Sequence, residues 1–141
     1  MRIIVLLVAM IFTPLSFAAS ETAEGIVENG LKAYKQQGAK AAMEAWVKGS
    51  GLEDSKAAIS QANSLLQIED YYGSYQDHEI VKVNDISKRS KMILFVMNYE
   101  NGIAFGKFQA YKSSKNGWVA TEFKFHTEAA LIWPRDSVYG K

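Results

Sequence analysis

Residues 91–127 read KMILFVMNYENGIAFGKFQAYKSSKNGWVATEFKFHT and contain three runs rich in aromatic and β-branched residues, at 91–99, 103–112 and 118–127. Asn101-Gly102 and Asn116-Gly117 separate these runs. Asn-Gly is preferred at the centre of two-residue β-hairpin turns, because both positions need a positive φ. A fourth run, at 80–86, precedes them. The sequence therefore predicts four strands joined as an antiparallel meander.

The two Asn-Gly pairs also predict the register of this meander. If each pair fills the centre of a two-residue turn, counting outwards places Phe108 opposite both Phe95 and Phe125. That register gathers apolar side chains on one face of the sheet, which we expect to form the core. The expected core residues are Ile93, Phe95, Met97, Tyr99, Ala104, Phe108, Ala110, Val119, Phe123 and Phe125, with Gly106 beneath them. Burial of an aromatic side chain there is expected to contribute about 2 to 3 kcal/mol.

The segment upstream of the strands predicts three amphipathic helices. Apolar residues recur at helical spacing from Ala23 onward, and Gly38 ends the first helix. A second helix covers 40–48, and a third begins at Asp54 or Ser55 as its N-cap and ends at Gly73. Each helix must bury one face, so we expect the helices to pack on one face of a curved sheet. The expected fold class is therefore α+β.

This order of elements resembles the cystatin-like and nuclear-transport-factor-2-like α+β folds, in which a curved antiparallel sheet wraps a long helix. The resemblance implies a small exported bacterial protein and a sheet that often encloses a pocket. The chain departs from the usual pattern because no strand is predicted between its first helices. Members of these folds include isomerases, dehydratases, ligand binders and oligomerisation modules, so the fold does not select a function.

The N-terminus has the features of a secretory signal peptide. Arg2 is followed by an apolar run at 3–12, and small residues at Ser16 and Ala18 suit cleavage after Ala18. The apolar run is about half of the roughly twenty residues that cross a membrane. We therefore expect a signal peptide at 1–18, one domain at 19–134, a tail at 135–141, and a location in the periplasm or the medium, without a membrane span after cleavage.

Composition narrows the classes of partner. The chain has no cysteine, so an exported product must rest on its hydrophobic core without disulfides. Of its 16 basic residues Arg2 leaves with the signal peptide, which makes the mature chain formally neutral against 15 acidic residues. An extended basic groove is not predicted, so nucleic acid is not an expected partner.

The outer face of the predicted sheet is too apolar at one end for open water, around Leu94, Val96 and Phe105. It is covered either by a second copy of the protein or by the chain's own tail, where apolar residues at 131–133 precede Pro134. We favour self-association as a homodimer through this face. The expected interface residues are Leu94, Val96, Phe105, Lys107, Tyr111, Trp118 and His126.

A cluster of polar and aromatic residues marks the junction of the third helix and the first strand, and we expect it to rim a pocket. Its members are Asp70, Tyr71, Tyr72, Tyr75 and His78. An isomerase of the resembled fold would need a carboxylate base and an acid such as tyrosine in an apolar pocket. Alternatively, the tyrosines cover the edge of the core and the acidic groups are solvated.

No set of residues in the sequence predicts catalysis. Neither a Gly-x-Ser-x-Gly motif nor a phosphate-binding loop is present, and two histidines without cysteine predict no metal site or cofactor. We expect an exported, non-catalytic binding or protein-interaction module whose partner is an envelope protein or a small apolar ligand. The alternative is a small-molecule binder or isomerase-type enzyme with a pocket between helix and sheet.

Overall fold

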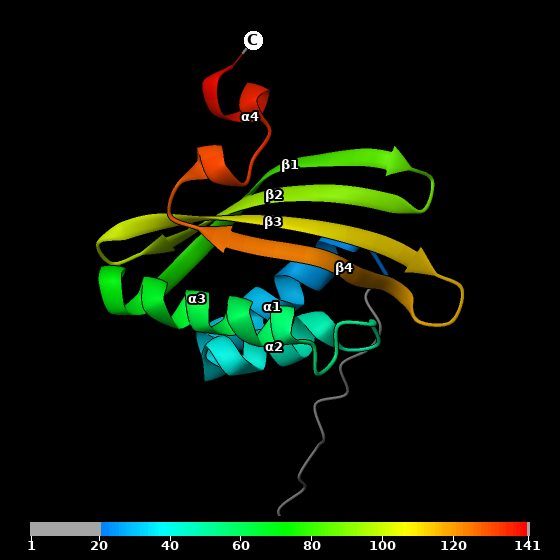
Figure 1. Cartoon of the computed structure of the whole chain (residues 1–141), viewed down its shortest axis with the longest axis horizontal. Helices are drawn as coiled ribbons and strands as arrows, with labels where there is room; N and C mark the ends of the chain where they lie inside the picture. Colours follow the sequence, from blue (N-terminus) through cyan, green and yellow to red (C-terminus); the bar gives the residue numbers. More distant parts are fainter. Residues whose placement is uncertain (1–20, 141) are drawn as a thin grey trace, which may run out of the picture.

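The computed structural model describes residues 21–140, in which helices precede an antiparallel sheet (Figure 1). The elements are α1 (Ala23–Gln37), α2 (Ala39–Val47), α3 (Lys56–Tyr72), β1 (Tyr75–Ser87), β2 (Ser90–Tyr99), β3 (Gly102–Ser113), β4 (Gly117–His126), a 3-10 turn (Ala129–Leu131) and α4 (Arg135–Tyr139). The 4-stranded sheet has the order β1-β2-β3-β4. The predicted α+β class and meander are confirmed. The predicted signal peptide lies outside the described residues.

The helix boundaries follow from their caps. The Thr22 side chain accepts a hydrogen bond from the Gly25 N–H, and the Ser55 side chain accepts one from the Ala58 N–H. Each of these bonds satisfies an N–H group that has no partner inside the helix. Gly73 ends α3 with a φ of +80°, a conformation that favours glycine. The predicted ends at Gly38 and Gly73 and the N-cap at Ser55 are confirmed.

The predicted register of β2 and β3 is wrong by two residues. Tyr99 pairs with Gly102, so Phe95 lies opposite Gly106 and not opposite Phe108. The turn is displaced because it packs on the end of α3, where the Asn101 N–H donates to the Tyr72 carbonyl oxygen at 2.9 Å. This tertiary contact outweighs the local preference of Asn-Gly. Because the error is an even number, every side chain stays on its predicted face.

The predicted register of β3 and β4 is also wrong. Ser113 pairs with Gly117, which takes a φ of +66° and closes a longer loop than the predicted two-residue turn. A bulge then lies between the pairs Ala110–Ala120 and Gln109–Glu122.

Because of the bulge, the β4 residues that precede it lie on the opposite faces of the sheet from those predicted. Trp118 packs against the main core instead of lying on the outer face. Val119 is buried but pairs with the outer-face residue Tyr111, and Ala120 takes the inner position in its place.

The core lies between the helices and the inner face of the sheet, as Figure 1 shows in the layering of α1, α2 and α3 against the strands. All ten residues predicted for the core are buried, although Val119 is buried on the outer side. Trp46 of α2 fills the centre, with ring centroids 5.4 Å from Phe108 and 5.1 Å from Phe125. Its indole also lies so close to Gly30 of α1 that a Cβ there would overlap it. Aromatic side chains therefore fill the space between the helices and the sheet.

The C-terminal tail covers the apolar end of the outer sheet face. Trp133 packs on Leu94 and Val96, and its ring meets that of Phe105 edge-on at 5.2 Å. Leu94 is 0% exposed as a result. The packed residues of the tail continue to Val138. Of the two coverings left open by the sequence, the tail occupies this patch. None of the helices in the described part of the chain could span a membrane.

Candidate functional site

An open cleft of about 670 Å³ lies between the C-terminal half of α3 and the end of β4. The two elements are tied together by a hydrogen bond of 3.0 Å from the Phe125 N–H to the Gln61 side-chain oxygen. The cleft is lined by Ser64, Gln67, Ile68, Asp70, Tyr71, Tyr72, Phe125, His126 and Thr127. Its volume falls in the range of roughly 300 to 1,000 Å³ that small-molecule sites occupy.

The cleft combines a buried apolar part with an aromatic rim. Ile68 and Phe125 are buried and supply apolar surface. Tyr71, by contrast, is 85% exposed, and its ring meets that of Tyr72 edge-on at a centroid distance of 6.1 Å. A tyrosine ring carries a large apolar surface, which folded proteins usually bury. The exposed ring of Tyr71 is therefore free to contact a ligand in the cleft.

The polar groups of the cleft include both hydrogen-bond donors and acceptors. The His126 Nδ1 accepts a hydrogen bond of 2.9 Å from the Glu128 N–H, so the neutral ring carries its proton on Nε2. The Ser64 hydroxyl donates to the Ser60 carbonyl oxygen at 3.1 Å and keeps its own oxygen as an acceptor. Asp70 adds a carboxylate and Gln67 an amide. A ligand with both donors and acceptors can satisfy these groups together.

Comparisons of this chain with protein-family models, with curated proteins and with solved structures find no match. Among the described residues no group of three or more His, Cys, Asp or Glu side chains could hold a metal ion.

The cluster predicted to rim one pocket is divided between two depressions. Asp70, Tyr71 and Tyr72 line the cleft beside β4. Tyr75 and His78 instead line a separate groove of about 400 Å³ between α1 and β1. The chain turns at Gly73, where α3 ends and β1 begins two residues later, and this turn separates the two groups.

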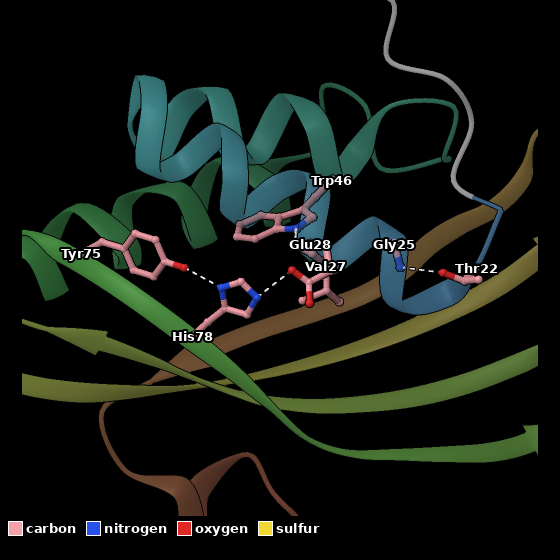
Figure 2. A network of polar contacts seen from close by, with 7 residues as sticks. All are labelled: Thr22, Gly25, Val27, Glu28, Trp46, Tyr75 and His78. Atoms are coloured by element: carbon pink, nitrogen blue, oxygen red, sulfur yellow. Dashed lines mark hydrogen bonds and ion pairs between the residues drawn. The ribbon is translucent and has the colours of Figure 1, made fainter.

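His78 of the second groove joins α1 to β1 (Figure 2). Its Nδ1 lies 2.8 Å from the Tyr75 hydroxyl, and its Nε2 lies 2.8 Å from a carboxylate oxygen of Glu28. Since a carboxylate only accepts hydrogen bonds, Nε2 carries a proton; in the neutral ring Nδ1 then accepts from the hydroxyl. Burial raises the pKa of Tyr75 above its usual value, which keeps that proton on the phenol. Both ring nitrogens are engaged, so the arrangement holds two elements together and offers no free base.

A buried tyrosine cluster lies beneath this contact. The Tyr34 ring stacks on that of Tyr75 at 4.9 Å, and its hydroxyl lies 3.1 Å from the hydroxyl of Tyr99. Burial raises the pKa of Tyr34 and of Tyr99 well above the ordinary value. Burial and the neighbouring charge of Asp70 also raise the pKa of Glu69. None of Tyr34, Tyr99 and Glu69 lines the cleft, so these perturbed groups act on stability and not on a bound molecule.

The residues predicted to form an outer-face interface do not share one open surface. Leu94 and Val96 are buried under the tail, with Phe105 partly covered there, and Trp118 faces the core. Trp133 of the tail covers the apolar end of this face, and the bulge in β4 turns Trp118 toward the core. The remaining candidates are engaged elsewhere.

Lys107 lies 3.5 Å from a carboxylate oxygen of Glu122, and Tyr111 packs beneath the Arg89 guanidinium at 5.0 Å. His126 lines the cleft. The tail covers the apolar patch on which the expected self-association was based, and the homodimer itself stays a prediction.

Several lining residues were missed at the sequence level, namely Ser64, Gln67, Ile68, Phe125 and Thr127. Four of the α3 residues that line the cleft, at 64, 67, 68 and 71, have the spacing of one helix face. The polar residues Ser64 and Gln67 at that spacing from the predicted rim residue Tyr71 were the available signal. Phe125 was assigned only to the core, and it is both buried and in contact with the cleft.

Proposed function

We propose that this protein is a non-catalytic binding module that takes a small ligand in the cleft between α3 and β4. The observation that carries the proposal is the exposed Tyr71 ring at the rim of a cleft that is also lined by hydrogen-bond donors and acceptors. Surface tyrosine of this kind, next to convergent donors and acceptors, is typical of ligand sites. The affinity is expected to be modest, because an open cleft excludes little water from around the ligand.

We propose a non-catalytic role because of where the titratable groups lie. Catalytic acids and bases are commonly groups with perturbed pKa values that face a cleft. The groups whose pKa values are raised, Tyr34, Tyr75, Tyr99 and Glu69, do not line this one. Asp70 and His126 do line it, but no hydrogen bond among the described residues joins them into a relay.

An isomerase-type pocket between helix and sheet is less well supported. Trp46, Phe108 and Phe125 pack against one another in that space, at centroid distances of 5.4 Å and 5.1 Å from the indole. A ligand there would have to displace the centre of the core. We therefore assign binding to the cleft between α3 and β4.

We also propose that the chain is an exported, divergent relative of the cystatin-like and nuclear-transport-factor-2-like folds. The order of helices followed by an antiparallel meander supports the relationship, and the apolar run after Arg2 supports export. The chain differs in passing from α1 to α2 without a strand between them. Export can be tested by N-terminal sequencing of protein recovered from the periplasm, which should begin at Ala19.

Binding can be tested by thermal-shift screening of a library with neutral, cationic, anionic and apolar compounds. A ligand at about one hundred times its Kd stabilises the folded state by about 2.7 kcal/mol. We expect a hit whose stabilisation is lost in Tyr71→Ala and kept in Tyr139→Ala. Tyr139 is a matched control because it is also a largely exposed tyrosine, on α4. A screen without hits, or hits that are indifferent to Tyr71, would overturn the proposal.

A further inference from the structure

We infer that the ligand of the α3–β4 cleft is a neutral saccharide, an inference that rests on the proposed function. The chemistry of the lining residues separates this class from anions, cations and purely apolar molecules.

Anionic ligands are disfavoured by charge. Asp70 contributes a carboxylate to the lining, and no lysine or arginine is among the described residues that form it. Glu69 and Glu128 adjoin lining residues in the chain and add negative charge nearby. Phosphate and carboxylate groups are usually held by arginine, lysine or a helix N-terminus. This cleft lies at the C-terminal half of α3, whose dipole end is negative.

Cationic ligands are disfavoured because Asp70 is the one carboxylate among the described lining residues and other polar groups there are hydrogen-bond donors. Asp70 is exposed, and an ion pair with an exposed carboxylate contributes little because water and salt screen it. The His126 Nε2–H and the Gln67 amide present N–H donors, which an ammonium group cannot accept from. A cation would therefore leave part of the cleft unmatched.

A sugar matches both the polar and the apolar parts of the cleft. Each sugar hydroxyl donates and accepts at once, so it can pair with the imidazole N–H, the amide of Gln67 and the carboxylate of Asp70. The flat C–H face of a pyranose ring can stack on the exposed Tyr71 ring, where C–H groups meet the negative face of the π system. Ile68 and Phe125 supply apolar surface for a neighbouring unit.

The test is an NMR titration of the labelled protein, following amide shifts. The probes are neutral oligosaccharides built from glucose, galactose, mannose and N-acetylglucosamine, with choline, inorganic phosphate and indole as the other classes. We expect one or more neutral oligosaccharides to shift the amides of Gln67, Tyr71 and His126. Tyr71→Ala should weaken binding by about tenfold or more, whereas Tyr139→Ala should leave it unchanged.

A second measurement separates a sugar from a cation at the same place. The dependence of affinity on salt reports whether the ligand is charged, because salt screens an ion pair with the exposed Asp70 carboxylate. For a neutral sugar we expect little change in affinity between about 0.05 M and 0.5 M salt. A large loss of affinity at the higher salt concentration would overturn the saccharide inference.

The possible failures are distinguishable. If choline, phosphate or indole shifts the cleft amides and no neutral oligosaccharide does, the saccharide inference is overturned and the proposed binding function stands. If no probe of any class shifts them, both are overturned.

Discussion

The indole Nε1–H of Trp133 donates a hydrogen bond of 2.9 Å to the carbonyl oxygen of Gly106, which joins the C-terminal tail to the middle of β3. The same side chain covers Leu94 and Val96 on the outer face of the sheet. One residue thus holds the tail both by a polar contact and by apolar burial. This makes it the principal anchor of the segment.

Replacement of this anchor should release the tail. We expect Trp133→Ala to lower the free energy of unfolding by about 3 kcal/mol, because a large buried aromatic side chain is lost. The uncovered Leu94 and Val96 should also increase dye binding and concentration-dependent mass. Urea denaturation and light scattering measure these effects. Leu131→Ala is the control, since Leu131 is 63% exposed in the same tail; a similar loss in both variants would contradict the anchoring role.

Gly30→Ala should destabilise the protein, although alanine is the better helix former by about 1 kcal/mol. A Cβ at Gly30 would overlap the Trp46 indole, which cannot move without disturbing Phe108 and Phe125. We expect a loss of about 1 to 3 kcal/mol in chemical denaturation. Gly51→Ala, where a Cβ would meet nothing within 4 Å, should be nearly neutral. A stabilised Gly30→Ala protein would mean that α1 and α2 are less closely packed.

Tyr75→Phe should loosen the contact between α1 and β1. The substitution removes the hydroxyl that lies 2.8 Å from the His78 Nδ1 and keeps the ring that stacks on Tyr34. We expect a loss of about 1 kcal/mol, the usual net effect of one hydrogen bond. Tyr139→Phe, at a 70% exposed tyrosine, is the matched control. Equal unfolding midpoints for the two variants would show that the hydroxyl contributes nothing.

Stability should fall at alkaline pH because of the buried phenols. Burial raises the pKa of Tyr34, Tyr75 and Tyr99 above the ordinary value of 10.0, so the folded protein keeps protons that the unfolded chain releases. Their contribution is therefore fully present below pH 10 and decreases as the pH rises beyond it. Phenolate absorbance should show these groups ionising together with unfolding, as followed by circular dichroism. Ionisation of all tyrosines before any unfolding would contradict their burial.

The fold class and core could be predicted because they depend on local signals and on an alternation of period two. Gly38, Ser55 and Gly73 marked helix ends by their own chemistry. The residues of β2 and β3 were assigned to the correct faces of the sheet although their predicted register was wrong. A shift of two residues leaves Phe95 and Phe108 on the same side.

The remaining features depend on contacts that are distant in sequence. The Asn101 turn is positioned by the end of α3, and the bulge that turns Trp118 inward has no dipeptide signature. His78 finds its partner Glu28 fifty positions away, on α1. The candidate cleft likewise needs β4 to lie beside α3, so its residues could be only partly predicted.

The most direct test of the proposed site is a map of amide shift changes for the strongest ligand found in solution. Binding at the cleft predicts that the largest changes lie at Gln67, Tyr71 and His126, with none at the tail residues 132–138. Changes concentrated on the tail or on the outer sheet face, with the three cleft amides unmoved, would contradict it.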